Sequence, residues 1–346
     1  MKETATDDVR IQSLRPLLPP AILMEELPCS EHGLSQVTAF RKAVSDVLTG
    51  KDNRLVVVVG PCSIHDPKAG LEYAERLLEE SRRLSDDLLI VMRTYFEKPR
   101  TTIGWKGLIN DPHLDDSFSI NQGLRIARGF LRDVVELGLP TGTEFLDPIS
   151  PQFIADLVSW GAIGARTVES QVHRELASGL SMPVGFKNGT GGSIQIAVDA
   201  LRSARHPHRF LSVTKQGLAA IVETTGNSDC HVILRGGGGQ PNYSAETIGQ
   251  TAQRLEKAGV NKRLMIDCSH ANSGKDPERQ PAVAEAVAEQ LEGGNIFGVM
   301  LESFLLGGRQ DAAPGKPLTY GQSITDGCLS WEATVPVLEL LARARR

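Results

Sequence analysis

The sequence has few cysteines, no excess of basic residues and no long apolar run. Its five cysteines are scattered among 346 residues, odd in number and without Cys-x-x-Cys spacing. This argues against a disulfide framework and a structural zinc site, and it favours a reducing cytoplasm. The net charge of −5 gives no general attraction to nucleic acid or to anionic membranes. Because Met1–Asp8 is polar and no run approaches bilayer length, we expect no leader and no membrane span.

Short apolar runs alternate with longer amphipathic segments from about residue 55 onward. The runs are Leu55–Val59, Leu88–Met92, Pro140–Phe145, Ile163–Val168, Pro183–Lys187, His231–Arg235, Leu264–Asp267 and Phe297–Glu302. Helical patterns cover Gly70–Leu84, Gly123–Leu137, Pro151–Trp160, Ser193–Arg205 and Ser244–Ala258. Continuously apolar runs are typical of parallel strands covered on both faces. The rhythm predicts an α/β fold, a (β/α)8 TIM barrel, with an open doubly wound sheet as the alternative.

Two segments interrupt this rhythm. Residues 1–50 precede the first strand and contain Leu17-Leu18-Pro19-Pro20, so we assign them to an N-terminal arm and residues 51–346 to the barrel. Two β-rich runs within Arg209–Thr224 surround Lys215-Gln216-Gly217. They predict an extra hairpin at about residues 209–226, before the sixth strand. A decorated loop and a regulatory element are both open interpretations of it.

Charged or ligating side chains stand at the predicted carboxyl end of each strand, where barrel enzymes place their active sites. These residues are Cys62, Arg93, Glu144, Arg166, Lys187, Arg235, His270 and Glu302. Three arginines and a lysine that converge on one pocket predict a substrate with several negative charges. Each of them alone is as consistent with a surface ion pair.

A metal site is the second prediction for this end of the barrel. Cys62 follows the first strand, His270 follows the seventh, Glu302 ends the eighth, and Asp326 comes later in the chain. One thiolate, one imidazole and two carboxylates suit a divalent transition metal with room for substrate or water. His65 competes as a ligand, although a position in the turn beside Asp66 is the simpler interpretation.

Three further patterns suggest anion binding. Glu97-Lys98-Pro99-Arg100-Thr101 places two cations and a hydroxyl on a loop stiffened by proline; an exposed basic loop is the alternative. Lys187 could be a Schiff-base nucleophile or a phosphate ligand. The glycines of Arg235–Gly239 allow backbone amides to approach an anion, or they form a flexible turn.

Together these motifs resemble the class I, feedback-regulated 3-deoxy-D-arabino-heptulosonate 7-phosphate (DAHP) synthases. The resemblance covers nearly the whole chain. It includes Gly60–Pro67 (GPCSIHDP), Arg93–Thr101 (RTYFEKPRT), Gly104–Pro112 (GWKGLINDP), Gly161–Arg174 (GAIGARTVESQVHR), Pro183–Thr190 (PVGFKNGT) and Ser323–Asp326 (SITD). It implies metal-dependent condensation of phosphoenolpyruvate with erythrose 4-phosphate, the first step of the shikimate pathway to chorismate. Related octulosonate phosphate synthases carry Ala-Asn where this chain has Pro99, which favours the four-carbon aldehyde.

The resemblance also implies a role for each matching residue. The metal ligands would be Cys62, His270, Glu302 and Asp326, holding one divalent Mn, Fe, Co or Zn ion. Phosphoenolpyruvate would be bound by Arg93, Lys98, Glu144, Arg166, Lys187 and Arg235. Erythrose 4-phosphate would contact Lys98, Pro99, Arg100 and Thr101. Lys98, Glu144 and His270 would act in catalysis, with Glu144 near the attacking water.

Regulated members of this family bind an aromatic amino acid between the barrel, the hairpin and the N-terminal arm of a neighbouring subunit. The matching positions here are Asp7, Asp8, Ile11, Pro151, Gln152, Leu180, Ser181, Phe210, Ser212 and Val222. Ser212 matches the phenylalanine-sensitive pattern, whereas tyrosine-sensitive relatives resemble Gly there. We therefore expect phenylalanine as the effector, with tyrosine second, and a homotetramer or homodimer.

Two other functions stay open at this stage. A metal-free Schiff-base aldolase would use Lys187, but it would leave the four predicted metal ligands without a shared purpose. A non-catalytic barrel that senses an amino acid would not need intact phosphate-binding residues. Cys328, two residues past Asp326, is expected either to approach Cys62 and pair with it on oxidation, or to be a buried thiol without a role.

Overall fold

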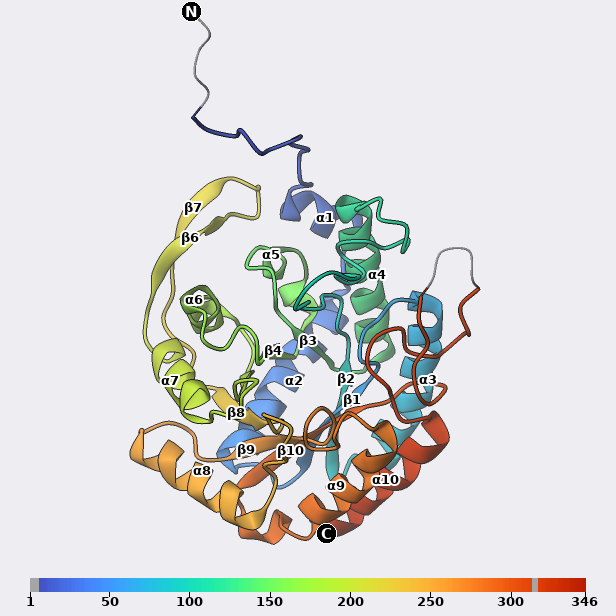
Figure 1. Cartoon of the computed structure of the whole chain (residues 1–346), viewed down its shortest axis with the longest axis vertical. Coiled ribbons are helices and arrows are strands. Elements are labelled where there is room, and N and C mark those ends of the chain that lie inside the picture. The colour runs from blue at the N-terminus through green and yellow to red at the C-terminus, as the bar shows by residue number, and fades with distance from the viewer. Residues whose placement is uncertain (1–5, 313–316) are drawn as a thin grey trace, which may run out of the picture.

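The computed structural model describes residues 6–312 and 317–346, so the first five residues of the expected arm lie outside it. The barrel strands are Leu55–Gly60 (β1), Leu88–Arg93 (β2), Thr141–Glu144 (β3), Trp160–Ile163 (β4), Val184–Lys187 (β5), Cys230–Leu234 (β8), Leu264–Asp267 (β9) and Ile296–Glu302 (β10). They form a closed parallel barrel in the order β1-β10-β9-β8-β5-β4-β3-β2 (Figure 1). Closure confirms the (β/α)8 prediction and excludes the open sheet.

Helices follow the strands and cover the outside of the barrel. They are Pro67–Arg83 (α3), Ile120–Leu137 (α4), Pro151–Ile154 (α5), Gln171–Gly179 (α6), Gln195–Ala204 (α7), Ala245–Lys257 (α8), Gln280–Ala288 (α9) and Trp331–Arg345 (α10). Short 3-10 turns are Ala155–Leu157, Pro277–Arg279 and Leu291–Gly293. The apolar faces of these helices pack on the outward side chains of the strands, which builds the larger core of the protein.

A helix from the segment predicted as an arm closes the amino end of the barrel. Pro20–Glu26 (α1) is followed by Glu31–Thr49 (α2), which begins where the Ser30 side chain accepts a hydrogen bond from the Gly33 amide. Val44 and Val47 of α2 pack on inward side chains of the barrel, among them Val56 and Leu89. Because α2 covers this end, the carboxyl end is the open end of the barrel in the described part of the chain.

The predicted boundaries around β4 are wrong. The pattern predicts a helix over Pro151–Trp160 and a strand over Ile163–Val168, but β4 is Trp160–Ile163 and Arg166 lies in the turn beyond it. The reason is tertiary packing: Trp160 is fully buried inside the barrel and its Nε1 donates to His231 Nε2 at 3.2 Å. Local propensity cannot report such a contact across the barrel.

The predicted hairpin is present as an antiparallel pair, Arg209–Val213 (β6) and Ala219–Glu223 (β7). It curves away from the barrel beside α6 and α7, toward α1 (Figure 1). Its tip meets the start of α1, where the Ala21 amide donates to the Lys215 carbonyl at 2.7 Å. One face of the ribbon is exposed, and the other turns toward the barrel.

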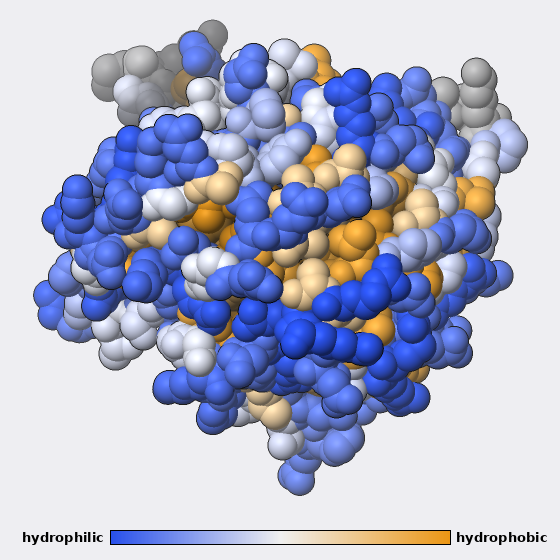
Figure 2. All heavy atoms as spheres, turned by 90° about the horizontal axis from the view of Figure 1, so that it is seen from below, coloured by the Kyte–Doolittle hydropathy of each residue, from blue (hydrophilic) through white to orange (hydrophobic). Residues whose placement is uncertain are grey.

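Hydrophilic side chains dominate the face seen in Figure 2, with hydrophobic ones in a central band. This face belongs to the end of the molecule at which α8, α9 and α10 lie in Figure 1. Within the described residues, no helix combines the length and the apolar character needed to cross a bilayer.

Candidate active site and effector cavity

A cavity of about 130 Å³ opens at the carboxyl end of the barrel and is lined by side chains from many strand ends. The predicted residues that line it are Arg93, Lys98, Pro99, Arg100, Glu144, Arg166, Lys187, Arg235, His270 and Asp326. Residues that the sequence analysis did not single out also line it: Gly164, Ala165, Thr190, Lys275 and Thr325. Six arginine and lysine side chains predicted to bind substrate thus meet in one place, together with a further lysine.

Three of the four predicted metal ligands lie together beside this cavity. Ligand atoms of Cys62, Glu302 and Asp326 are all within 4.8 Å of one another. One sulfur and two carboxylate donors suit a divalent transition metal. Burial, followed by the charge of Glu302, raises the pKa of the Cys62 thiol; a bound cation reverses this, because a coordinating thiol is deprotonated. The donor set therefore fits a metal ion.

His270, the fourth predicted ligand, lies outside this three-residue cluster. Its Nδ1 is 2.9 Å from Asp267 Oδ2 and 2.7 Å from the Ser269 hydroxyl, so Nδ1 is already engaged. The residue has a positive φ of 56° and lines the same cavity as Asp326. Nε2 is thus the ring nitrogen left for a ligand, and the Asp267 contact fixes the orientation of the ring.

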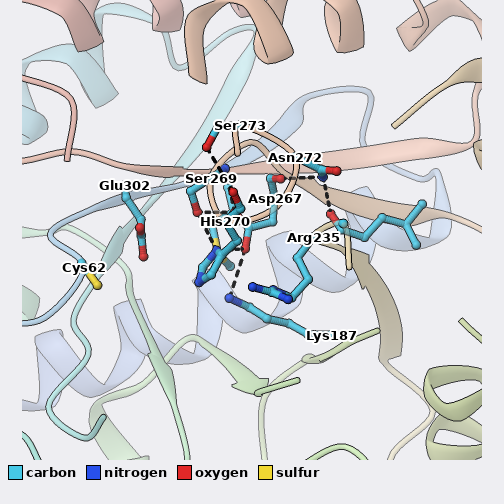
Figure 3. A network of polar contacts seen from close by, with 12 residues as sticks. Cys62, Lys187, Arg235, Asp267, Ser269, His270, Asn272, Ser273 and Glu302 are labelled. Carbon is cyan, nitrogen blue, oxygen red and sulfur yellow. Dashed lines mark hydrogen bonds and ion pairs between the residues drawn. The ribbon is translucent and has the colours of Figure 1, made fainter. Parts of the chain in front are cut away.

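Asp267 is a functional candidate that the sequence analysis missed. This fully buried carboxylate at the end of β9 accepts a hydrogen bond from Lys187 Nζ at 3.1 Å and contacts His270, as Figure 3 shows. Burial raises the pKa of Asp267, but the charges of His270 and Lys187 outweigh burial and hold the pKa well below its usual range. The signal was available, because Asp267 is the last residue of an apolar run at the active end.

The backbone and side chain of Glu302 are held by two buried partners. Arg93 donates to Glu302 Oε1 at 3.0 Å and lies over the Tyr95 ring at 3.6 Å from its centroid. Gln280 of α9 donates to the Glu302 carbonyl at 2.9 Å and accepts from its amide at 2.8 Å. Arg93 is therefore fixed by Glu302 and Tyr95, and it also lines the cavity.

The predicted aldehyde-binding loop places Lys98 beside the metal cluster. Lys98 Nζ lies 3.1 Å from both the carbonyl oxygen and the Sγ of Cys62. Burial opposes the charge of Lys98, but Cys62 and the nearby carboxylates outweigh burial and raise its pKa. Pro99 and Arg100 line the same cavity, whereas Thr101 lines an adjoining outer cavity of about 720 Å³ with Arg166, Arg235 and Lys275.

Glu97 links this loop to the start of α5 and gives a testable dependence of stability on pH. It accepts hydrogen bonds from the Ser150 hydroxyl at 2.8 Å and the Asp147 amide at 3.2 Å, and burial raises the pKa of Glu97 to about 7 from 4.5. Between pH 4.5 and about 7, the Glu97 carboxyl group is protonated in the folded state but ionised in the unfolded state. The resulting stabilisation is present in full below pH 4.5 and disappears as pH rises to about 7, about 3 kcal/mol in all.

We expect Glu97→Gln to remove that pH dependence. In urea unfolding at pH 5 and pH 8, the wild type should lose stability relative to the variant as pH rises. Glu79→Gln, at an exposed position of α3, is the control and should follow the wild type. Parallel pH profiles for wild type and Glu97→Gln would contradict the raised pKa of Glu97.

Comparison with known proteins identifies the family. The model of the DAHP synthetase I family matches residues 29–339. The Phe-sensitive phospho-2-dehydro-3-deoxyheptonate aldolase of Escherichia coli is 58% identical over 98% of this chain and 97% of its own. The chain belongs to the DAHP synthetase I family. The tyrosine-inhibited aldolase of Schizosaccharomyces pombe is 54% identical over 98% of this chain and 93% of its own.

A solved structure of another relative agrees with this assignment to the DAHP synthetase I family. The phospho-2-dehydro-3-deoxyheptonate aldolase from Francisella tularensis superposes with a TM-score of 0.95 at 54% identity. The alignment covers 97% of this chain and 99% of that one. The overall fold of this chain is thus shared with a DAHP synthase, which confirms the resemblance inferred from the motifs.

Seven of the ten predicted effector residues of this DAHP synthetase I family member line one cavity of about 360 Å³. They are Pro151, Gln152, Leu180, Ser181, Phe210, Ser212 and Val222. The cavity lies between α5, α6 and the inner face of the hairpin. Arg41, Asp156 and Lys215 also line it and were missed from the sequence. Lys215 and Asp156 bring charges of opposite sign to this cavity, and Asp156 is paired through both carboxylate oxygens with Arg128.

The remaining three predicted effector residues are not brought to this cavity. Asp7, Asp8 and Ile11 are exposed, and the arm that carries them extends away from the barrel beyond α1 (Figure 1). The sequence analysis expects a neighbouring subunit to contribute these three residues. A single chain does not test that expectation, so it stays a prediction. Ile11 is held locally, since its amide donates to the Asp8 carbonyl at 2.9 Å.

Cys328 lies next to Cys62, in agreement with one of the two alternatives left open by the sequence. Its Sγ accepts a hydrogen bond from the Cys62 amide at 3.4 Å, and both thiols are free and buried. His65, the competing ligand, is absent from the metal cluster of the described residues and packs edge-on against Phe304, with centroids 6.1 Å apart. Pairing of Cys62 and Cys328 on oxidation stays a prediction.

Proposed function

We propose that this chain catalyses the metal-dependent condensation of phosphoenolpyruvate with D-erythrose 4-phosphate and water to give DAHP and phosphate. The observation that carries the proposal is the position of Lys98, in contact with Cys62 of the metal cluster and at the edge of the cation-lined cavity. A polarised aldehyde and a polyanionic enol phosphate would meet at such a place. The names of the relatives are consistent with this activity.

The chain's own side chains account for binding and proton handling in this proposal. Arg166, Lys187 and Arg235 would bind the phosphate and carboxylate of phosphoenolpyruvate and hold its methylene carbon toward the aldehyde. Lys98 would deliver a proton or positive charge to the aldehyde oxygen as the new carbon–carbon bond forms. Glu144 would hold the water that adds to the second carbon before phosphate leaves. A metal held by Cys62, Glu302 and Asp326, with His270, would supply Lewis-acid polarisation.

The surroundings of Lys187 favour this proposal over a Schiff-base aldolase. An imine-forming lysine is activated in an apolar pocket or beside another cation. Lys187 has Arg235 nearby in the same cavity, but its ammonium group is stabilised by a buried ion pair with Asp267 at 3.1 Å. A lysine so engaged is a phosphate ligand, and the condensation then proceeds without an enzyme-bound imine.

Chelation tests the proposal directly. We expect the absorbance of phosphoenolpyruvate to disappear in the presence of erythrose 4-phosphate, the rate to fall by at least about tenfold after EDTA, and Mn²⁺ to restore it. The physical reason is that Cys62, Glu302 and Asp326 cannot themselves polarise an aldehyde, and the ion that they would hold supplies this. Turnover that survives thorough chelation would remove the metal from the mechanism. No turnover with Mn, Fe, Co or Zn would favour a non-catalytic amino-acid sensor.

We further propose that phenylalanine inhibits the enzyme through the hairpin cavity, with tyrosine second. Ser212 lines that cavity, and in this proposal its side chain would occupy the space that a tyrosine hydroxyl needs, whereas glycine would leave room for it. Phenylalanine is therefore expected to suppress turnover at lower concentration than tyrosine, and Ser212→Gly to narrow that preference by about tenfold. Dose–response curves for both amino acids measure this. Suppression of the wild type by tyrosine but not by phenylalanine would contradict the role given to Ser212.

The proposed function also suggests how the subunits assemble and where in the cell the enzyme acts. A homotetramer or homodimer would let the exposed arm of one subunit reach the cavity of another, and Val9 and Leu14 on that arm are 67% and 81% exposed. We place the enzyme in the cytoplasm, where its five free cysteines stay reduced. Phosphoenolpyruvate, erythrose 4-phosphate and the effector are the proposed small-molecule partners, without nucleic acid or membrane.

A further inference from the structure

Three asparagine side chains connect the chain segments that follow β5, β8 and β9. Asn188 comes directly after Lys187, Asn242 follows the glycine-rich stretch after β8, and Asn272 lies in the loop after β9. Asn188 and Asn272 are buried, and Asn242 is half-buried. Because a buried amide is costly unless its hydrogen bonds are made, the partners of these side chains indicate what they hold in place.

Asn188 makes two of its four side-chain hydrogen bonds to the backbone of Arg235 and Gly236. Its Oδ1 accepts hydrogen bonds from the Arg235 amide at 2.9 Å and from Asn242 Nδ2 at 3.1 Å. Its Nδ2 donates to the carbonyls of Gly189 and Gly236, each at 3.0 Å. Two bonds accepted and two donated exhaust the capacity of an asparagine side chain. No group of Asn188 is left over for a ligand.

Asn242 and Asn272 extend the network to β9. Asn242 Oδ1 accepts from the Gly236 amide at 2.7 Å, and the Asn242 amide donates to Asn272 Oδ1 at 2.8 Å. Asn272 Nδ2 donates to the carbonyls of Leu234 at 3.2 Å and Asp267 at 2.8 Å, and Figure 3 shows it beside Asp267. The backbone on both sides of Arg235 is therefore fixed by amides from three separate segments.

Arg235 depends on this support because it lies just beyond the end of β8. The strand ends at Leu234, and Gly236 has a φ of 70°, which only glycine adopts at little cost. A segment of this kind has little rigidity of its own. Its guanidinium group nevertheless points to the same place as the Lys187 amine (Figure 3), in the cavity proposed for phosphoenolpyruvate.

We propose that Asn188, Asn242 and Asn272 are positioning residues that hold Arg235 in the geometry required to bind the phosphoenolpyruvate anion. The inference rests on the proposed function. The three asparagines, all in the described chain, are not among the residues that line the cavity, so they act through Arg235 and not by touching the substrate. Their loss weakens binding of phosphoenolpyruvate more than it slows the chemical step.

Steady-state kinetics on the full-length protein with Mn²⁺ test this inference. Asn242→Ala is expected to raise KM for phosphoenolpyruvate about tenfold and Asn188→Ala by more, with kcat within about threefold of wild type. In an Arg235→Ala background, the further change Asn242→Ala should alter KM less than about twofold, because the side chain that Asn242 positions has been removed.

Asn227→Ala is the matched control, assayed without effector. Asn227 is also buried, and its Nδ2 donates to the carbonyls of Ala177, Leu180 and Met182, away from Arg235. This variant should lower Tm while leaving KM for phosphoenolpyruvate unchanged. If Asn242→Ala and Asn188→Ala also lower Tm without moving KM, or if the Asn242 effect persists without Arg235, the inference is overturned. A wild type without turnover would overturn the proposed function and this inference with it.

Discussion

Replacement of Lys98 by methionine is expected to lower kcat by about a thousandfold at saturating metal and substrates. Lys98 touches the metal cluster, with Nζ 3.1 Å from Cys62 Sγ. Negative charge that develops on the aldehyde oxygen would form beside it, in a buried site where a fixed charge acts strongly. Methionine keeps the length and apolar contacts of the side chain but removes both the charge and the proton.

Lys106→Met is the control for this experiment. Lys106 is exposed on the same loop, and its carbonyl accepts a hydrogen bond from the Lys98 amide at 2.8 Å. The control should keep kcat within about twofold, as expected for a surface substitution. Because Lys98 also contacts a metal ligand, Mn²⁺ must be titrated to saturation in both variants. A Lys98→Met enzyme that regains full turnover at high Mn²⁺ would show that Lys98 assists metal binding and not the chemical step.

The fold was predictable because its signal is local. Continuously apolar runs such as Leu55–Gly60 and Leu88–Arg93 are buried on both sides in the barrel, so sequence and structure agree there within a residue. The prediction of the β4 boundaries was wrong because Trp160, Gly161 and Ala162 show no strand pattern in the sequence. Their strand forms because Trp160 fills the interior of the barrel, next to His231. The helix α2 was not predicted within the arm. Its apolar side chains pack on the barrel interior, whose residues come from strands later in the chain.

Candidate site residues were predictable where a single charged residue at the end of a strand is enough to mark the position. Lys187, Arg235 and Glu302 are found where the run of apolar residues stops. Two residues whose positions depend on distant segments were missed: Asp267, which lies between Lys187 and His270, and Lys215 at the hairpin tip, which lines the cavity beside α5 and α6. Such roles depend on which loops meet in space, and a single sequence does not specify those distances.

Asp267→Asn is expected to destabilise the protein by about 3–5 kcal/mol at pH 7 and to weaken binding of phosphoenolpyruvate. The substitution keeps the shape of the side chain but leaves Lys187, which is 3% exposed, without its counter-charge. The loss of stability arises mainly from that buried, unpaired ammonium group. Urea unfolding measures it, and fluorescence titration with phosphoenolpyruvate measures the change in affinity.

Two comparisons distinguish the loss of the Lys187–Asp267 ion pair from a simple packing defect. The pKa of Asp267 is depressed, so its charged form stabilises the fold above its usual value of 3.8, and that stabilisation is lost as pH falls below 3.8. The penalty of Asp267→Asn should therefore be present at pH 7 and shrink as pH falls below about 4. Adding Lys187→Met should recover part of the lost stability, because it removes the unpaired charge. A double variant less stable than Asp267→Asn alone would place the loss in the hydrogen bonds to Ser269, at 2.6 and 3.0 Å, and not in the ion pair.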